Sequence, residues 1–190
     1  MSSTLVLGPA AGGRSHHALS LLSGTPQVTW VCPPEPAGQA GVEPAPEVAQ
    51  PLTTNVPAPS TWIRVETTDL ARALIQSRHP VLIDDLETWV GAVLDSTQGW
   101  EDPETATALV HDLVDQFQVA LMAVPVDVVV LGRDPGLLAA ATAPGEQLLH
   151  DLLGAVVRRV GATCSRVELV VAGRLLDLGS SLRVQGAALR

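Results

Sequence analysis

The chain has 190 residues, of which 46% are hydrophobic and 16% are charged, so it can bury the core of one ordinary domain and is not globally disordered. Its 20 acidic and 11 basic side chains give a formal net charge of −9, which argues against nucleic acid as a main partner because phosphate neutralisation needs a basic face. No apolar run approaches the ~20 residues of a membrane span, and the N-terminus lacks the basic and then apolar pattern of a signal peptide, so we expect a soluble cytoplasmic protein.

The N-terminal segment predicts the opening of an α/β sheet. Residues 4–7 are apolar and stop at a Gly-Pro pair, which is typical of a buried strand followed by a turn. Residues 15–22 carry apolar side chains at helical spacing, and residues 28–31 form a second apolar run. The predicted order is therefore strand, glycine-rich loop, helix and strand.

Residues 33–59 interrupt this alternation. Eight of these 27 residues are Pro and three are Glu, and the segment has no basic residue, no His and no aromatic residue. Such a segment buries too little apolar surface to offset the entropy lost on ordering. We interpret it as a flexible proline-rich insertion within a single domain that covers residues 1–190. A lid over an active site is the alternative, although the segment offers few phosphate-binding donors.

Regular order resumes after this insertion. The pattern predicts strands at 62–65, 81–83, 126–131 and 167–172, and helices at 69–77 (capped by Thr67 or Thr68), at 86–97, from Asp102 through Leu121, and at 146–162. The tail after Gly173 is ambiguous. Uninterrupted apolar strands between amphipathic helices indicate an α/β fold of three layers, with a mostly parallel central sheet and helices on both faces.

The strongest local signal is the loop after the first strand. Its sequence, Gly-Pro-Ala-Ala-Gly-Gly-Arg-Ser, fits the spacing of a P-loop, with Arg14 where Lys is usual, and it lies between a buried strand and a helix. Backbone N–H groups at such a helix N-terminus favour anions. We predict that the whole loop binds a nucleotide and that Arg14 is catalytic: Gly8, Pro9, Ala10, Ala11, Gly12, Gly13, Arg14 and Ser15. A glycine-rich turn without a ligand is the open alternative.

A carboxylate pair follows the strand at residues 81–83. Ligands of nucleotides and of Mg²⁺ gather at the carboxyl ends of parallel strands. We predict that Asp84 is catalytic and, together with Ser15, holds Mg²⁺, with Asp85 as the substitute. An N-cap for the helix that begins at Leu86 is the alternative role of this pair.

The cysteines and histidines add no second site. Cys32 and Cys164 form no CxxC motif, so we expect two small buried side chains in a reducing compartment. No two of the five histidines show metal-ligand spacing. Metalloenzyme and hydrolase-triad functions are therefore not predicted.

Four motifs together resemble the adenosylcobinamide kinase / adenosylcobinamide-phosphate guanylyltransferase family. The run from Leu5 to Ala18 resembles the family's strand and G-G-A-R-S-G-K-S-x-x-A loop. Residues 62–66, Trp-Ile-Arg-Val-Glu, resemble its W-x-T-x-E, and residues 81–89 resemble its L-L-x-D-C-L-T-x-W. Residues 128–173 follow the family pattern without gaps, so the resemblance covers nearly the whole chain outside the insertion.

This resemblance implies a P-loop NTPase-type fold and GTP or ATP with Mg²⁺ as the donor. It implies phosphate transfer to the hydroxyl of adenosylcobinamide, a corrinoid, followed by guanylyl transfer through a histidine, and it suggests a small homo-oligomer. By position, it places Glu66 and Asp84 in the nucleotide site.

The sequence departs from the family at polar positions. The guanylylated histidine of the family lies between the second strand and the W-x-T-x-E motif, and residues 33–61 contain no His. Residues 133–136, Arg-Asp-Pro-Gly, replace N-E-V-G, and Val157-Arg158 replaces N-Q. Three functions stay open: a kinase that has lost guanylyl transfer, a degenerate nucleotide- or corrinoid-binding pseudoenzyme that regulates or scaffolds a partner, and a structural domain with an empty site.

Overall fold

The structure is a computed structural model that describes residues 2–9, 12–34, 59–137 and 140–182. Most of the predicted insertion, and Ala10 and Ala11 of the glycine-rich loop, lie outside the described residues. The strands are β1 (Ser3–Leu7), β2 (Thr29–Cys32), β3 (Ile63–Glu66), β4 (Val81–Ile83), β5 (Val128–Gly132), β6 (Arg166–Val171) and β7 (Arg174–Asp177). The helices are α1 (Arg14–Leu21), α2 (Leu70–Gln76), α3 (Leu86–Ser96), α4 (Pro103–Ala123) and α5 (Pro144–Thr163), with a 3₁₀ turn, η3 (Pro135–Leu137).

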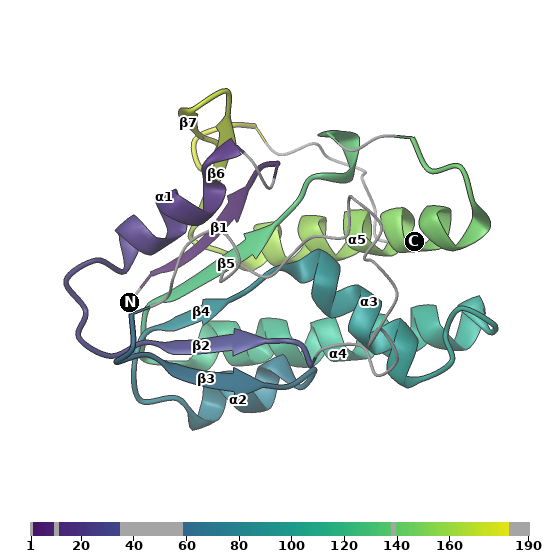
Figure 1. Cartoon of the computed structure of the whole chain (residues 1–190), viewed down its shortest axis with the longest axis horizontal. Coiled ribbons are helices and arrows are strands. Elements are labelled where there is room, and N and C mark those ends of the chain that lie inside the picture. Colours follow the sequence, from purple (N-terminus) through teal and green to yellow (C-terminus); the bar gives the residue numbers. More distant parts are fainter. Residues whose placement is uncertain (1, 10–11, 35–58, 138–139, 183–190) are drawn as a thin grey trace.

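The strands form one sheet in the order β3-β2-β4-β5-β1-β6-β7 (Figure 1). Every neighbouring pair is parallel except β6 and β7, which are antiparallel. Leu5 of β1 is in register with Val130 of β5 on one side and with Val167 of β6 on the other. The first strand in the sequence is therefore an interior strand, and the mostly parallel sheet that the pattern predicts is confirmed.

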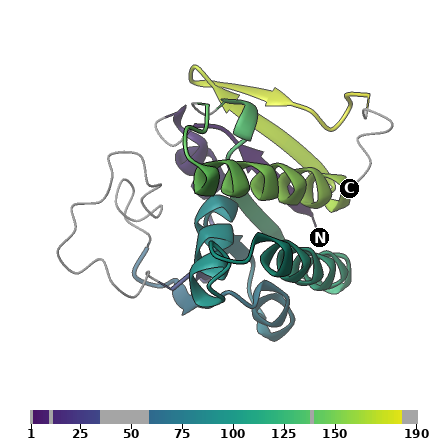
Figure 2. The ribbon, with the colours of Figure 1, turned by 90° about the vertical axis from the view of Figure 1, so that its right-hand side faces the viewer.

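Helices cover both faces of the sheet, which confirms the three-layer α/β fold. One core lies between the sheet and α2, α3, α4 and α5, and its largest fully buried side chains include Trp89 and Phe117. Helices α4 and α5 lie side by side over this face (Figure 2). On the other face, Ala18 and Leu22 of the α1 segment pack on Val6 and on other strand side chains. Apolar residues fill both interfaces, as parallel strands covered on both faces require.

Three helices begin at an aspartate whose side chain accepts a backbone hydrogen bond. Asp85 caps α3, and Asp102 caps α4 as the sequence predicts. The predicted cap of α2, Thr67 or Thr68, is wrong. Asp69 is the N-cap, because its carboxylate accepts the Arg72 N–H at 2.9 Å, while the Thr67 hydroxyl accepts the N–H of Asp69 at 3.0 Å.

Two elements were not predicted, η3 and β7. Strand β7 lies in the tail that the sequence leaves ambiguous, and it pairs with β6 through a turn at Ala172 and Gly173, both of which have positive φ. Within the described part of the chain, no helix combines the length and the apolar character that a membrane crossing requires.

Candidate functional site

The carboxyl ends of three neighbouring strands bring the predicted polar residues to one edge of the sheet. In the sheet order, β5 separates β1, which leads into the glycine-rich loop, from β4, which leads into Asp84 and Asp85. Neighbouring strands lie about 4.8 Å apart, so side chains from the ends of β1 and β4 can meet across the end of β5. Ligands of open α/β sheets bind at this edge.

The described glycines of the loop are required by geometry. Gly8 has φ +150°, and a Cβ on it would lie 2.5 Å from the carbonyl oxygen of Val170 in β6. Gly13 has φ +91° and is the N-cap of α1. These positions explain why the chain between β1 and α1 carries glycines and passes close to β6.

The turn from the loop into α1 presents backbone N–H groups. The Gly12 N–H donates to the Pro9 carbonyl at 2.9 Å, so it is used within the loop. The first hydrogen bond inside α1 runs from the His17 N–H to the Gly13 carbonyl. The N–H groups before His17 have no partner inside the helix, and together with the helix dipole they favour an anion. Ser15 lies half-buried in this first turn.

Arg14 is buried and points to the end of β4. Its Nη2 donates to Oδ2 of Asp85 at 2.7 Å, and each of the two side chains is only 4% exposed. The other carboxylate oxygen of Asp85 accepts the Glu87 N–H at 3.2 Å, which is the cap of α3. Asp85 therefore joins the glycine-rich loop to α3. The sequence offers Asp85 only as a substitute for Asp84 or as a cap, and it does not indicate this ion pair.

Asp84 is buried beside Asp85 but faces another partner. Its Oδ2 accepts the indole N–H of Trp30 at 3.1 Å, and its backbone N–H donates to the Val31 carbonyl. Trp30 belongs to β2, so the Asp84 side chain is oriented by the strand that lies next to β4 on the side away from β1. The Asp84 carboxylate is thus buried at the edge of the sheet and held in place by β2.

Glu66 lies on the edge strand of the sheet. It ends the edge strand β3, where it is paired in register with Cys32, and its exposed carboxylate lies 2.7 Å from Nη2 of Arg64. Three strands separate β3 from β1. Only β2 separates β3 from β4, however, and the charges of Glu66 and Asp84 both act on Cys32 at the end of β2. The structure therefore brings together Arg14, Asp84 and Asp85, with Glu66 on the far side of β2.

A second ion pair lies at the same edge. Nε of Arg133, which follows β5, is 2.9 Å from Oε2 of Glu87 in α3. Both side chains are largely buried, and the N–H is not directed at the oxygen, so the contact is an ion pair without a well-formed hydrogen bond. Burial raises the pKa of Glu87, with the Asp85 charge acting in the same direction, while Arg133 and Arg14 lower it. Two Arg–carboxylate pairs thus span the ends of β1, β4 and β5.

His17 belongs to a third polar group that the sequence does not indicate. Its Nε2 lies 2.7 Å from Oε2 of Glu168, whose other oxygen accepts from Nη2 of Arg166 at 2.6 Å. Glu168 is 1% exposed on β6. The sequence does carry one indication of such a group, an acidic residue inside an apolar strand, because a buried carboxylate needs partners.

The described residues include no group of three or more His, Cys, Asp and Glu side chains arranged to hold a metal ion. A site made of Ser15 and Asp84 is a different kind of site. Mg²⁺ bound together with nucleotide phosphates usually takes one or two protein oxygen ligands and completes its shell with phosphates and water. One hydroxyl and one carboxylate fit that donor chemistry.

Both cysteines are free and buried, as predicted. Burial raises the pKa of Cys164 to about 12 and also raises the pKa of Cys32, although the N–H of Arg64 donates to the Cys32 sulfur at 3.3 Å and partly offsets this. Because the thiolate is the reactive form, we expect both thiols of the folded protein to react slowly with a disulfide reagent at pH 8. Both should react fully in denaturant. Rapid reaction of one thiol in the folded protein would contradict this assignment.

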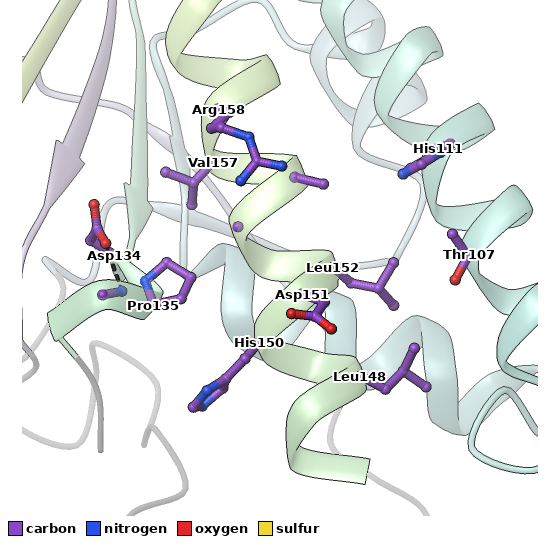
Figure 3. Close-up of a pocket in the computed structure, with 13 residues that line it drawn as sticks. Thr107, His111, Asp134, Pro135, Leu148, His150, Asp151, Leu152, Val157 and Arg158 are labelled. Atoms are coloured by element: carbon purple, nitrogen blue, oxygen red, sulfur yellow. Dashed lines mark hydrogen bonds between the residues drawn. The ribbon is translucent and has the colours of Figure 1, made fainter. Parts of the chain in front are cut away.

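A cavity of about 900 Å³ lies between η3, α4 and α5. Figure 3 shows Asp134 and Pro135 on the η3 side, His150 and Arg158 on α5, and His111 across the cavity on α4. Leu148 and Leu152 add apolar surface. Because η3 comes two residues after Arg133, the cavity begins beside the end of β5, the neighbour of β1. Its lining offers charged, polar and apolar groups to one ligand.

Comparison with known proteins adds one finding. A family model described as "Cobinamide kinase / cobinamide phosphate guanyltransferase" matches residues 4–178. No curated protein matches the chain.

Proposed function

Because the chain belongs to the cobinamide kinase / cobinamide phosphate guanyltransferase family of cobalamin biosynthesis, we propose that it is a nucleotide-dependent kinase for a corrinoid alcohol. In this proposal it transfers the γ-phosphoryl group of GTP or ATP to the hydroxyl of adenosylcobinamide. The observation that carries the proposal is the loop from Gly8 to Ser15, which leads from an interior strand into a helix beside the carboxylates that follow β4.

Each proposed role follows from the position of the residue. The glycine-rich loop and the first turn of α1 bind the phosphates through backbone N–H groups. The cation of Arg14, once released from Asp85, would reach the transferred phosphoryl group, and Ser15 and Asp84 would hold a Mg²⁺ ion that offsets its charge. The role of Glu66 in the nucleotide site rests on the family pattern alone, because the side chain lies on the edge strand.

The corrinoid would occupy the cavity between η3, α4 and α5. A corrinoid carries many carboxamide groups, which both donate and accept hydrogen bonds, around a large apolar ring. The cavity offers Asp134 and Asp151 as acceptors, Arg158 as a donor, and leucine side chains for the ring. Its position beside the end of β5 supports delivery of a hydroxyl to the edge of the sheet where the phosphates would lie.

We propose that guanylyl transfer by the covalent route of the family is lost, because residues 33–61 contain no His to carry the guanylyl group. A second candidate function is binding of a nucleotide or a corrinoid without turnover, in which the chain regulates or scaffolds a partner. The observation that favours it is the buried pair of Arg14 and Asp85, because this pair directs the guanidinium to a carboxylate of the protein.

Thermal unfolding with Mg²⁺ alone, and then with GTP or ATP, tests the proposal. A ligand at about 100 times its Kd adds about 2.7 kcal/mol to the stability of the folded state, which corresponds to several degrees for a domain of this size. We expect such a shift, followed by transfer of radiolabelled γ-phosphate to adenosylcobinamide. A shift without transfer would favour the second candidate function. No shift with either nucleotide would overturn the kinase proposal and, of the second candidate function, would leave only corrinoid binding.

A further inference from the structure

The guanidinium of Arg14 has no surface open to a phosphate. The residue is 3% exposed, and Nη2 donates to Asp85. Its Nε and Nη1 are buried and find no hydrogen-bond partner among the residues that the structure describes. Any phosphate that contacts this side chain must therefore draw it out of its present position.

The burial of Arg14 leaves two donors unsatisfied. A buried polar group without a partner costs about 1–3 kcal/mol. The ion pair with Asp85 offsets this cost and keeps the Arg14 side chain buried. Asp85 itself has φ +70°, a backbone conformation that is unfavourable for most residues other than glycine and that Asp and Asn adopt more often than the rest. The Arg14–Asp85 ion pair is thus one strong contact, and it is opposed by two unsatisfied donors of Arg14 and by the positive φ of Asp85.

From this arrangement we infer that Asp85 is a positioning residue that competes with the nucleotide phosphates for Arg14. The inference rests on the proposed function, since it assumes that phosphates bind at the loop from Gly8 to Ser15. In the structure, the Asp85 carboxylate pairs with the guanidinium as an internal anion. When a triphosphate binds, Arg14 leaves Asp85 for the phosphate, and the free energy of the broken ion pair is subtracted from that of binding. Asp85 therefore lowers the affinity for the nucleotide.

The test is Asp85→Asn, measured by calorimetric titration with MgATP, MgGTP and inorganic tripolyphosphate. Asn keeps the N-cap oxygen and tolerates the positive φ, so the substitution removes the charge and little else. We expect the affinity for all three probes to rise about tenfold or more, the equivalent of one charge-assisted hydrogen bond. We also expect the unfolding temperature to fall, because a buried ion pair is lost. A role that is merely structural would lower both the stability and the affinity.

Glu87→Gln is the matched control. It removes one negative charge from the same edge and breaks a largely buried pair, with Arg133. The ion-pair partner of Arg14 is Asp85, and the charge interaction of Glu87 with Arg14 is weaker than its interaction with Arg133. We expect lower stability and no gain in affinity. If Glu87→Gln tightens binding as much as Asp85→Asn does, the effect is general electrostatic repulsion and the inference is overturned. Asp85→Gly, which also tolerates positive φ, replaces Asp85→Asn if the latter does not fold.

The remaining outcomes separate the inference from the proposed function. If the wild type binds nucleotide and Asp85→Asn binds it no more tightly, only the inference is overturned. A gain for the nucleotides without a gain for tripolyphosphate overturns it as well, because the effect is then not on the phosphates. If the wild type does not bind and Asp85→Asn does, the competition is confirmed while the kinase function proposed for the wild type is overturned. If neither protein binds any probe, the inference and the proposed function are both overturned.

Discussion

Replacing Arg14 with methionine is expected to lower the free energy of unfolding by about 3–5 kcal/mol, because removing one partner of a buried ion pair leaves an uncompensated buried charge. The carboxylate that would be left is Asp85, whose side chain is 4% exposed. Methionine has a similar length and suits the buried environment, so lost packing adds little. Urea unfolding monitored by tryptophan fluorescence measures the effect.

A double variant identifies the cause of this loss. In Arg14→Met/Asp85→Asn both charges are absent, so we expect the double variant to be more stable than Arg14→Met alone and the two effects to be clearly non-additive. Arg72→Met, at an exposed position of α2, is the control and should change the stability by no more than about 0.5 kcal/mol. Additive losses in the double variant would mean that the two charges do not stabilise one another.

Replacing Gly8 with alanine is expected to abolish nucleotide binding and to lower the free energy of unfolding by about 1–3 kcal/mol, the cost of a strained backbone conformation. The added Cβ would lie 2.5 Å from the Val170 carbonyl oxygen, and the φ of +150° is one that side chains with a Cβ rarely adopt. Since the obstructing atom belongs to the backbone of β6 and not to a flexible side chain, the loop must move away from β6. The shift in unfolding temperature with nucleotide should then disappear.

Gly91→Ala is the control for this prediction. Gly91 lies in α3, and a Cβ on it would meet no heavy atom within 4 Å beyond its chain neighbours and the backbone of its own helix. Alanine should therefore stabilise the helix by about 0.5–1 kcal/mol and leave the shift with nucleotide unchanged. Retention of both stability and nucleotide binding in Gly8→Ala would show that the approach of the loop to β6 is not needed.

The sequence predicts the local features of this protein and fails where distant segments meet. The apolar run at residues 81–83 and the Asp-Pro-Glu start of α4 each indicate an element correctly, because strand and helix signals lie within a few neighbouring residues. Likewise, the loop from Gly8 to Ser15 is found by its spacing. The cap of α2 is Asp69 and not Thr67 or Thr68 because of the backbone conformation at the start of the helix. All three residue types suit an N-cap, so the sequence does not distinguish them.

The ion pairs could not be predicted in the same way. Arg14 and Asp85 are 71 positions apart and meet because only β5 separates β1 from β4 in the sheet. The strand order decides that contact, and apolar strands of similar composition do not reveal their order. In the same way, Glu168 is visible in the sequence as an acidic residue in a strand, but its partnership with His17 depends on α1 packing close to β6.

The interior position of β1 also has a consequence for the order in which the protein can fold during synthesis. The strand neighbours of β1 are β5 and β6. Both lie more than a hundred residues further along the chain, so they leave the ribosome much later. The strands β2, β3 and β4 pair with one another and can associate while the rest of the chain is still being made. The N-terminal strand stays unpaired until β5 has emerged, and it gains its second neighbour only with β6. The segment translated first, which carries the glycine-rich loop, is therefore among the last to reach its final structure.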